Sequence, residues 1–106
     1  MTKGIISGGV CGLITVVEAH KRGNGRIKLT ISSNCENIKK LAAEMDEIDP
    51  YDEIFRTLKL TRTCDVASQH LPHPSCIVPS GILKTIEVEA DLALPQEASI
   101  KIEKLY

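Results

Sequence analysis

The first third of the chain alternates between apolar and polar residues as β-strands do. Residues Val10–Ala19 are rich in β-branched side chains and predict a strand, and a shorter extended piece precedes them around Ile5-Ile6. Asn24-Gly25 predicts a tight hairpin, because both residues tolerate a positive φ. From Arg26 to Ser32 every second residue is apolar. These stretches predict an antiparallel sheet with one buried face and one face in water.

The apolar spacing then changes to that of helices. One amphipathic stripe predicts a helix, and its members are Ile38, Leu41, Ala42 and Met45. Ser33 or Asn34 is expected to cap this helix, with Cys35 in or just before its first turn. Asp49-Pro50 predicts the start of a second helix, with the aspartate as its cap and the proline at its first position.

The second half of the chain is less regular. Residues 59–70 show no clear periodicity, and residues 71–79 contain three prolines and predict a constrained loop. A helix is expected from about residue 79 to residue 92, before Pro95. Residues 98–104 alternate again and predict a short closing strand.

These elements predict one α+β domain over residues 1–106, a small antiparallel β-sheet of three strands plus a C-terminal strand, with helices packed on one face. Its length suffices for a single core. A net charge of −1, with one Phe, two Tyr and no Trp, gives no basis for a nucleic-acid partner. The N-terminal segment has neither secretory nor membrane-spanning character. We therefore expect a cytoplasmic protein without a membrane partner, in which cysteines stay reduced.

The four cysteines are the residues best suited to chemistry. No two of them form the Cys-x₂-Cys pair that marks zinc ribbons, so the fold would have to assemble any common site. Cys11 lies among glycines, and Cys35 and Cys76 each precede a predicted helix, where backbone N–H groups favour a thiolate. A thiolate serves both as a metal ligand and as a nucleophile. His73 lies close enough to Cys76 in sequence to share a metal ion with it.

Other interpretations of these residues stay open. Free cysteines often fill core space. Disulfides are open to three connectivities, although a reducing cytosol disfavours them. His70 can take the place of His73 as a ligand, whereas His20 is expected to be solvated.

The motifs have a recognisable order. Gly9–Gly12 contains the first cysteine before a strand, Asn24-Gly25 forms a hairpin, and Ser33–Cys35 opens a helix. Leu71-Pro72 then precedes a cysteine and the helical residues Ile82–Glu87. This order and spacing resemble the U-type iron–sulfur cluster assembly scaffolds over most of the chain.

The resemblance implies that Cys11, Cys35 and Cys76 correspond to the three cluster-binding cysteines of those scaffolds. It also implies a cluster donor or acceptor protein as a partner. The aspartate that follows Cys-Gly in the scaffolds is Leu13 here, and Cys64 has no counterpart in them. Since four thiolates can close the coordination of zinc or of a cluster, we expect Cys64 to be a fourth ligand of a more permanently held metal.

The leading hypothesis is a small metal-binding protein, for which iron–sulfur cluster assembly, storage or transfer is one role; the sequence does not settle whether it has an enzymatic activity. It would hold an iron–sulfur cluster or Zn²⁺ through Cys11, Cys35, Cys64 and Cys76, with His73 as a further metal ligand. One alternative is a sulfur-transfer protein with a reactive thiol. Another is a metal-free interaction module with structural cysteines, for which a homodimer through the edge near residues 98–104 is one arrangement.

Overall fold

The structure is a computed structural model that describes residues 1–106. One layer is a four-stranded antiparallel sheet in the order β1-β2-β3-β4. Its strands are β1 (Thr2–Ser7), β2 (Ile14–Lys21), β3 (Ile27–Ser33) and β4 (Glu47–Ile48). The predicted α+β class is confirmed.

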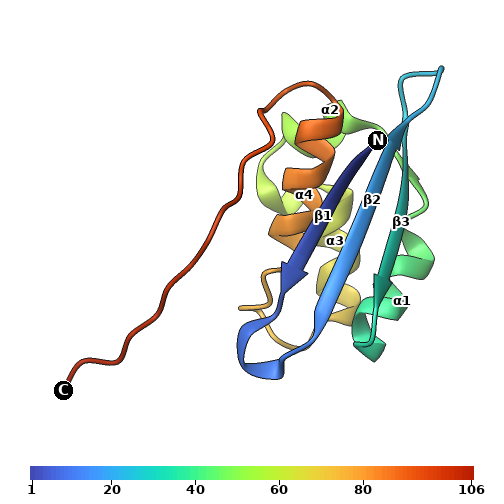
Figure 1. The fold of residues 1–106 in the computed structure, drawn as a ribbon. Coiled ribbons are helices and arrows are strands. Elements are labelled where there is room, and N and C mark those ends of the chain that lie inside the picture. Colours follow the sequence, from blue (N-terminus) through green and yellow to red (C-terminus); the bar gives the residue numbers. More distant parts are fainter.

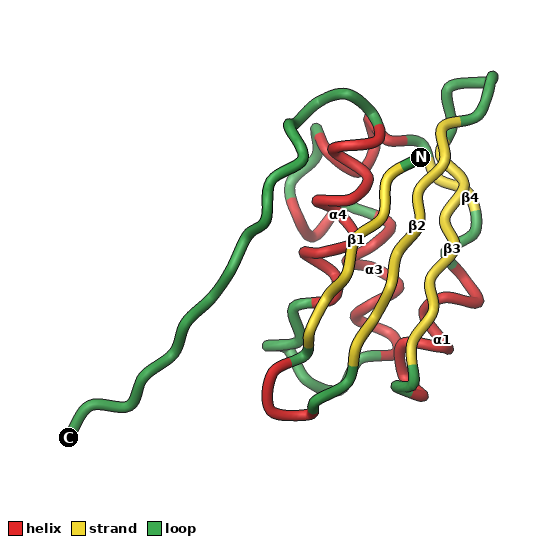
Figure 2. The backbone as a smooth tube through the Cα atoms, viewed as in Figure 1, coloured by secondary structure: helices red, strands yellow, loops and turns green.

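The helices cover one face of this sheet, as predicted (Figure 1). They are α1 (Glu36–Glu44), α2 (Pro50–Ile54), η2 (Leu58–Leu60), α3 (Arg62–His70) and α4 (Val78–Glu89), whereas the short 3₁₀ turn η1 (Gly9–Cys11) lies in the connection between β1 and β2. Helix α4 packs on β1 and β2, α1 packs on β3, and α3 lies against both helices. The other face of the sheet carries no helix (Figures 1 and 2).

The core lies between the sheet and the helices. Alternation in the strands sends every second side chain into it, as the pattern predicted. The strands contribute Ile6, Val17, Ala19, Ile27, Leu29 and Ile48, and the largest helical contributions come from Ile38, Leu41, Val66, Ile82 and Ile86. No aromatic side chain is buried, so aliphatic packing alone fills this core.

Two local predictions are confirmed in detail. The hairpin between β2 and β3 turns at Gly25, whose φ is 82°, and the Arg26 backbone N–H donates to Asn24 Oδ1 at 3.0 Å. Helix α2 begins with Pro50 in its first turn, and Asp49 Oδ1 accepts from the Tyr51 backbone N–H at 3.0 Å. Both follow from short-range preferences of the residues involved.

Other boundaries differ from the predictions. Strand β2 begins at Ile14 and not at Val10, because Gly9 and Gly12 take positive φ values of 80° and 69° and turn the chain through η1. The capping prediction for α1 was wrong, since the N-cap residue is Cys35 and no side chain caps it.

The largest differences between the predicted and the observed elements lie in the second half of the chain. Helix α3 forms where no periodicity was seen, and α4 covers Val78–Glu89, ending before the predicted residue 92. The predicted closing strand at residues 98–104 is absent, and β4 is the fourth strand instead. Residues 91–106 leave the end of α4 as an extended tail (Figure 1).

Candidate cysteine site at one end of the sheet

Three chain connections meet at one end of the domain. Ser7 pairs with Ile14 and Thr15 with Ser33, so the β1–β2 connection and the end of β3 share an edge of the sheet. Helix α4 starts at the same end, because Gly81 in its first half abuts the side chain of Ile6. The β1–β2 turn, the start of α1 and the α3–α4 loop accordingly lie together at the lower end of Figure 1. We call this region the cysteine end, since each connection carries one cysteine.

Cys11 is the last residue of η1 in the glycine turn between β1 and β2. The Gly8 N–H donates to Leu13 O and the Gly12 N–H to Gly9 O, each at 2.9 Å, which closes the turn. The Cys11 sulfur lies against the backbone of Gly8, in the space that a Cβ atom on residue 8 would occupy. Residue 8 therefore has no room for a side chain. Cys11 as a whole is exposed, and it therefore lies at the surface of the cysteine end.

Cys35 joins the end of β3 to the start of α1. It keeps an extended conformation, with φ −79° and ψ 121°, and its carbonyl accepts the Lys39 N–H at 3.0 Å as the helix begins. The Cys35 N–H donates to Ser33 Oγ at 3.1 Å, and Ser33 Oγ also accepts from Thr15 Oγ1 at 3.0 Å. The half-buried Cys35 packs against the core. These contacts hold its backbone firmly relative to β2 and β3.

Cys76 and His73 share one turn of the proline-rich loop before α4. The Cys76 N–H donates to the His73 carbonyl at 3.2 Å. Cys76 is half-buried and packs against the core, whereas His73 is exposed. The turn keeps the two residues close together in space, in agreement with their sequence spacing.

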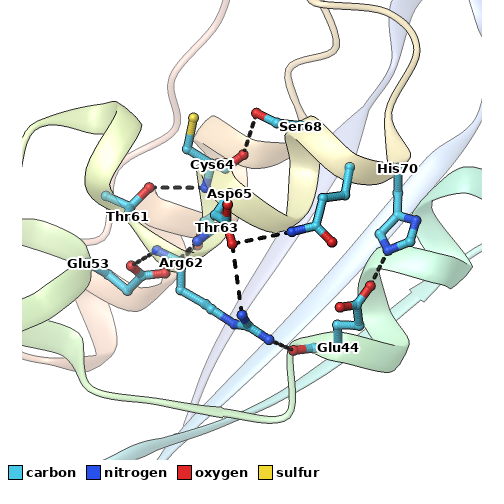
Figure 3. Close-up of polar contacts among 10 residues, drawn as sticks. Glu44, Glu53, Thr61, Arg62, Thr63, Cys64, Asp65, Ser68 and His70 are labelled. Carbon is cyan, nitrogen blue, oxygen red and sulfur yellow. Dashed lines mark hydrogen bonds and ion pairs between the residues drawn. The ribbon is translucent and has the colours of Figure 1, made fainter.

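Cys64 lies apart from the other three. It is in the first turn of α3, where its N–H donates to Thr61 Oγ1 at 3.0 Å, and its sulfur points away from His70 in Figure 3. His70 follows Cys64 by six positions in this helix, which is about 9 Å along the axis, and the cysteine end begins only beyond His70. The structure thus places Cys64 part-way along the helical layer.

The sulfurs do not form a preassembled metal centre. All four thiols are free, and no group of three or more Cys, His, Asp or Glu side chains has the spacing that would hold a metal ion. The fold brings Cys11, Cys35 and Cys76 to one end, with His73 beside Cys76, and leaves Cys64 outside that group.

Comparison with known proteins places the chain in a family. The profile of a family of unknown function, DUF6951, matches residues 2–102. The chain belongs to that family. No curated protein and no solved structure matches it. None of its helices has the length and apolar character needed to cross a bilayer.

This member of DUF6951 also contains a buried polar cluster that sequence reasoning missed. Glu53 of α2 accepts the backbone N–H groups of Arg62 and Thr63, each at 2.8 Å, and the Thr63 hydroxyl at 2.6 Å (Figure 3). Glu53 therefore caps α3 from a different helix, together with Thr61. The local signal was Thr61, a residue type favoured at N-caps, but the contribution of Glu53 depends on tertiary packing.

Two further polar contacts join α3 to α1. The His70 imidazole contacts the Glu44 carboxylate, and the Arg62 guanidinium donates to the Glu44 carbonyl at 3.4 Å (Figure 3). His70, an alternative ligand in the sequence analysis, is thus engaged with a carboxylate of α1. His73 keeps an exposed side chain.

The opposite end of the sheet holds the one carboxyl group with a clearly shifted pKa. Burial by itself would raise the pKa of Glu89, but hydrogen bonds from Thr2 Oγ1 at 2.7 Å and from the Lys21 N–H at 2.8 Å lower it below its ordinary 4.5. The positively charged N-terminus, 3.5 Å from Glu89 Oε1, adds to the lowering. Glu89 thereby fastens the end of α4 to the start of β1 and to the end of β2.

Proposed function

We propose that this protein binds a zinc ion or an iron–sulfur cluster at the cysteine end, through Cys11, Cys35 and Cys76. The observation that carries the proposal is that three separate connections, each with one cysteine, lie at the same end of the sheet (Figure 1). Thiolates are ligands that both zinc and iron–sulfur clusters accept. His73 supplies a fourth donor from the turn that holds Cys76, which gives a Cys₃His set.

The three sulfurs would have to move closer together when the metal binds. A tetrahedral zinc site with bonds of about 2.3 Å to sulfur places its sulfurs about 3.8 Å apart. Cys35 is the least mobile of the three, since Ser33 and the core hold it. The glycine turn of Cys11 and the loop of Cys76 can supply the movement, because neither belongs to a strand or an α-helix.

The accessible position of the site supports a role in cluster assembly, storage or transfer. Cys11 and His73 are exposed, so a donor or acceptor protein can approach the metal directly. The order of the three cysteines, in a turn before a strand, at a helix start and before the last helix, resembles that of the U-type scaffolds. In the proposal Cys64 is not a ligand, because about 9 Å of helix separates it from the start of the cysteine end.

Metal analysis of serine variants tests the proposal. Protein purified without oxygen is analysed for zinc, iron and sulfide and by visible absorption, as wild type and as C11S, C35S, C76S and C64S. We expect each of the first three variants to lose most of the bound metal, and C64S, the matched control, to keep it. Iron with sulfide and a coloured protein identifies a cluster, whereas one colourless zinc identifies a mononuclear site.

Two results would contradict the proposal. One is a metal content that stays the same in C11S, C35S and C76S. The other is a wild-type protein that remains metal-free after incubation with zinc and after cluster reconstitution. In the second case, one thiol that reacts much faster than the others with iodoacetamide would favour the sulfur-transfer alternative. Equally slow thiols would favour structural cysteines.

A further inference from the structure

The C-terminal tail is an unpaired strand-like segment. Asp91, with a φ of 61°, turns the chain out of α4, and the last backbone hydrogen bond runs from the Leu92 N–H to Glu87 O at 3.0 Å. Beyond it the tail extends away from the domain (Figures 1 and 2). Its large apolar side chains are exposed, namely Leu94, Ile100, Ile102 and Leu105. Ile100 and Ile102 alternate with Ser99, Lys101 and Glu103, which is the pattern of a strand with one apolar face.

Strand β1 offers an unpaired edge of matching length. It is the outermost strand of the sheet and pairs only with β2, so its other side presents free backbone N–H and C=O groups. It contains no proline, and Lys3 is its one charged residue. Ile5 points to the helix-free face with 68% of its surface exposed, next to Val16 of β2. Edges of this kind form ladders with further strands.

The point at which the tail leaves the domain indicates whether the tail pairs with the β1 of its own chain or with the β1 of a second copy. Helix α4 ends beside Thr2, as the contact between Thr2 and Glu89 shows. The tail therefore starts at the N-terminal end of β1, so within one chain the direct path along that strand runs parallel to it. An antiparallel ladder is the more stable arrangement, and a second copy can supply it without a reversal of the tail. The direction of the tail, away from its own sheet, fits such an exchange (Figure 1).

We propose that residues 98–103 of one copy pair antiparallel with β1 of a second copy, in a two-fold symmetric dimer. Both segments have six residues, and the register that pairs them fully sets Ser7 opposite Ala98 and Thr2 opposite Glu103. In this register Ile100 lies opposite Ile5 on the helix-free face. Ile102 lies opposite Lys3, whose aliphatic stem covers it. Each copy thus gains a fifth strand, and both exposed isoleucines of the tail find apolar neighbours.

Oligomeric state across a concentration series tests this dimer. Light scattering and sedimentation are expected to give twice the 11.6 kDa mass of one chain at high concentration. Ile102→Lys and Ile5→Lys are each expected to raise the dimer Kd by at least about tenfold, since each places a charge in the ladder. Gln96→Lys adds the same charge to an exposed part of the tail outside the ladder and should leave the Kd unchanged. Circular dichroism verifies that the variants fold.

Mixing the two disruptive variants separates this arrangement from other dimers. A heterodimer of the Ile5→Lys and Ile102→Lys chains restores one of the two ladders, with the unaltered tail on the unaltered β1. Each variant homodimer has a charge in both ladders, whereas in the heterodimer both charges fall in the same ladder. Because one charge is enough to open a ladder, we expect the mixture to dimerise more tightly than either variant alone. Three results would overturn the proposal. They are a wild-type protein that is monomeric at every concentration, a tail that pairs with its own β1, and a dimer whose Kd neither substitution changes.

Discussion

The buried carboxylate of Glu53 is expected to be among the most stabilising polar groups of the protein. It is 3% exposed and accepts three hydrogen bonds from the first turn of α3. We predict that Glu53→Ala lowers the free energy of unfolding by about 3 kcal/mol. The lost hydrogen bonds destabilise the protein, and the removal of a buried carboxylate offsets part of that loss.

The magnitude follows from the fate of the three donors. Thr63 is fully buried, so its N–H and its hydroxyl lose their acceptor and gain no water, at a cost of about 1–3 kcal/mol each. The N–H of Arg62 lies in an exposed residue and can bind water instead, so its loss costs less. Removal of the buried carboxylate returns part of this cost, because that group no longer has to be desolvated. About 3 kcal/mol is a large share of the stability of a domain of this size.

Urea unfolding followed by far-UV circular dichroism measures the effect. The matched control is Asp52→Ala, which removes an acid from the same helix. Asp52 forms an exposed ion pair with Arg56, with N and O atoms 2.9 Å apart, and its loss is expected to cost no more than about 0.5 kcal/mol. The loss of stability in Glu53→Gln should fall between those of Glu53→Ala and Asp52→Ala. Glutamine keeps one acceptor oxygen, but its amide N–H₂ group faces the donors of α3. The reasoning would be refuted by a loss below about 1 kcal/mol in Glu53→Ala, or by equal losses in Glu53→Ala and Asp52→Ala.

Three further predictions concern single contacts. The pKa of Glu89 is lowered in the folded state, so the ionised side chain stabilises the protein above the ordinary pKa of 4.5. This stabilisation is lost as the pH falls through the pKa of the folded state. Glu89→Gln should therefore be less stable than wild type at about pH 7 and equally stable in acid. Gly81→Ala should destabilise the protein by about 1–2 kcal/mol, because the added Cβ overlaps the Ile6 side chain. In a protein that already carries Ile6→Ala, Gly81→Ala should instead be stabilising, because alanine has a higher helix propensity than glycine. Asp49→Ala should cost about 1 kcal/mol through loss of the α2 cap, and Asp49→Asn much less, which thermal unfolding measures.

The first half of the fold could be predicted from sequence because its signals are local. Alternation of apolar residues sent Ile27 and Leu29 into the core, and Asn24-Gly25 specified the hairpin by conformational preference alone. The Asp49-Pro50 start of α2 is equally short-range. Such features depend on a few neighbouring residues, so periodicity and turn chemistry are enough to find them.

Helix α3 could not be predicted in this way. Its apolar contribution to the core is small, chiefly Val66 and Ala67, and its first turn is capped by Glu53 from another helix. A helix stabilised by distant partners leaves only a weak periodic signal in its own sequence. The position of Cys64 in the fold depends on α3, so local sequence could not predict that position either.

For the cysteine end, the sequence alone determined that Cys11, Cys35 and Cys76 each lie at a connection between elements. Only the tertiary structure decided that these three connections meet, because strand register and the direction of α4 together set which ends of the elements coincide. The tail shows the converse. Its alternating pattern predicted a strand over residues 98–104, but the structure has none there. A strand needs a partner for its backbone hydrogen bonds, and local sequence does not show whether the fold supplies one.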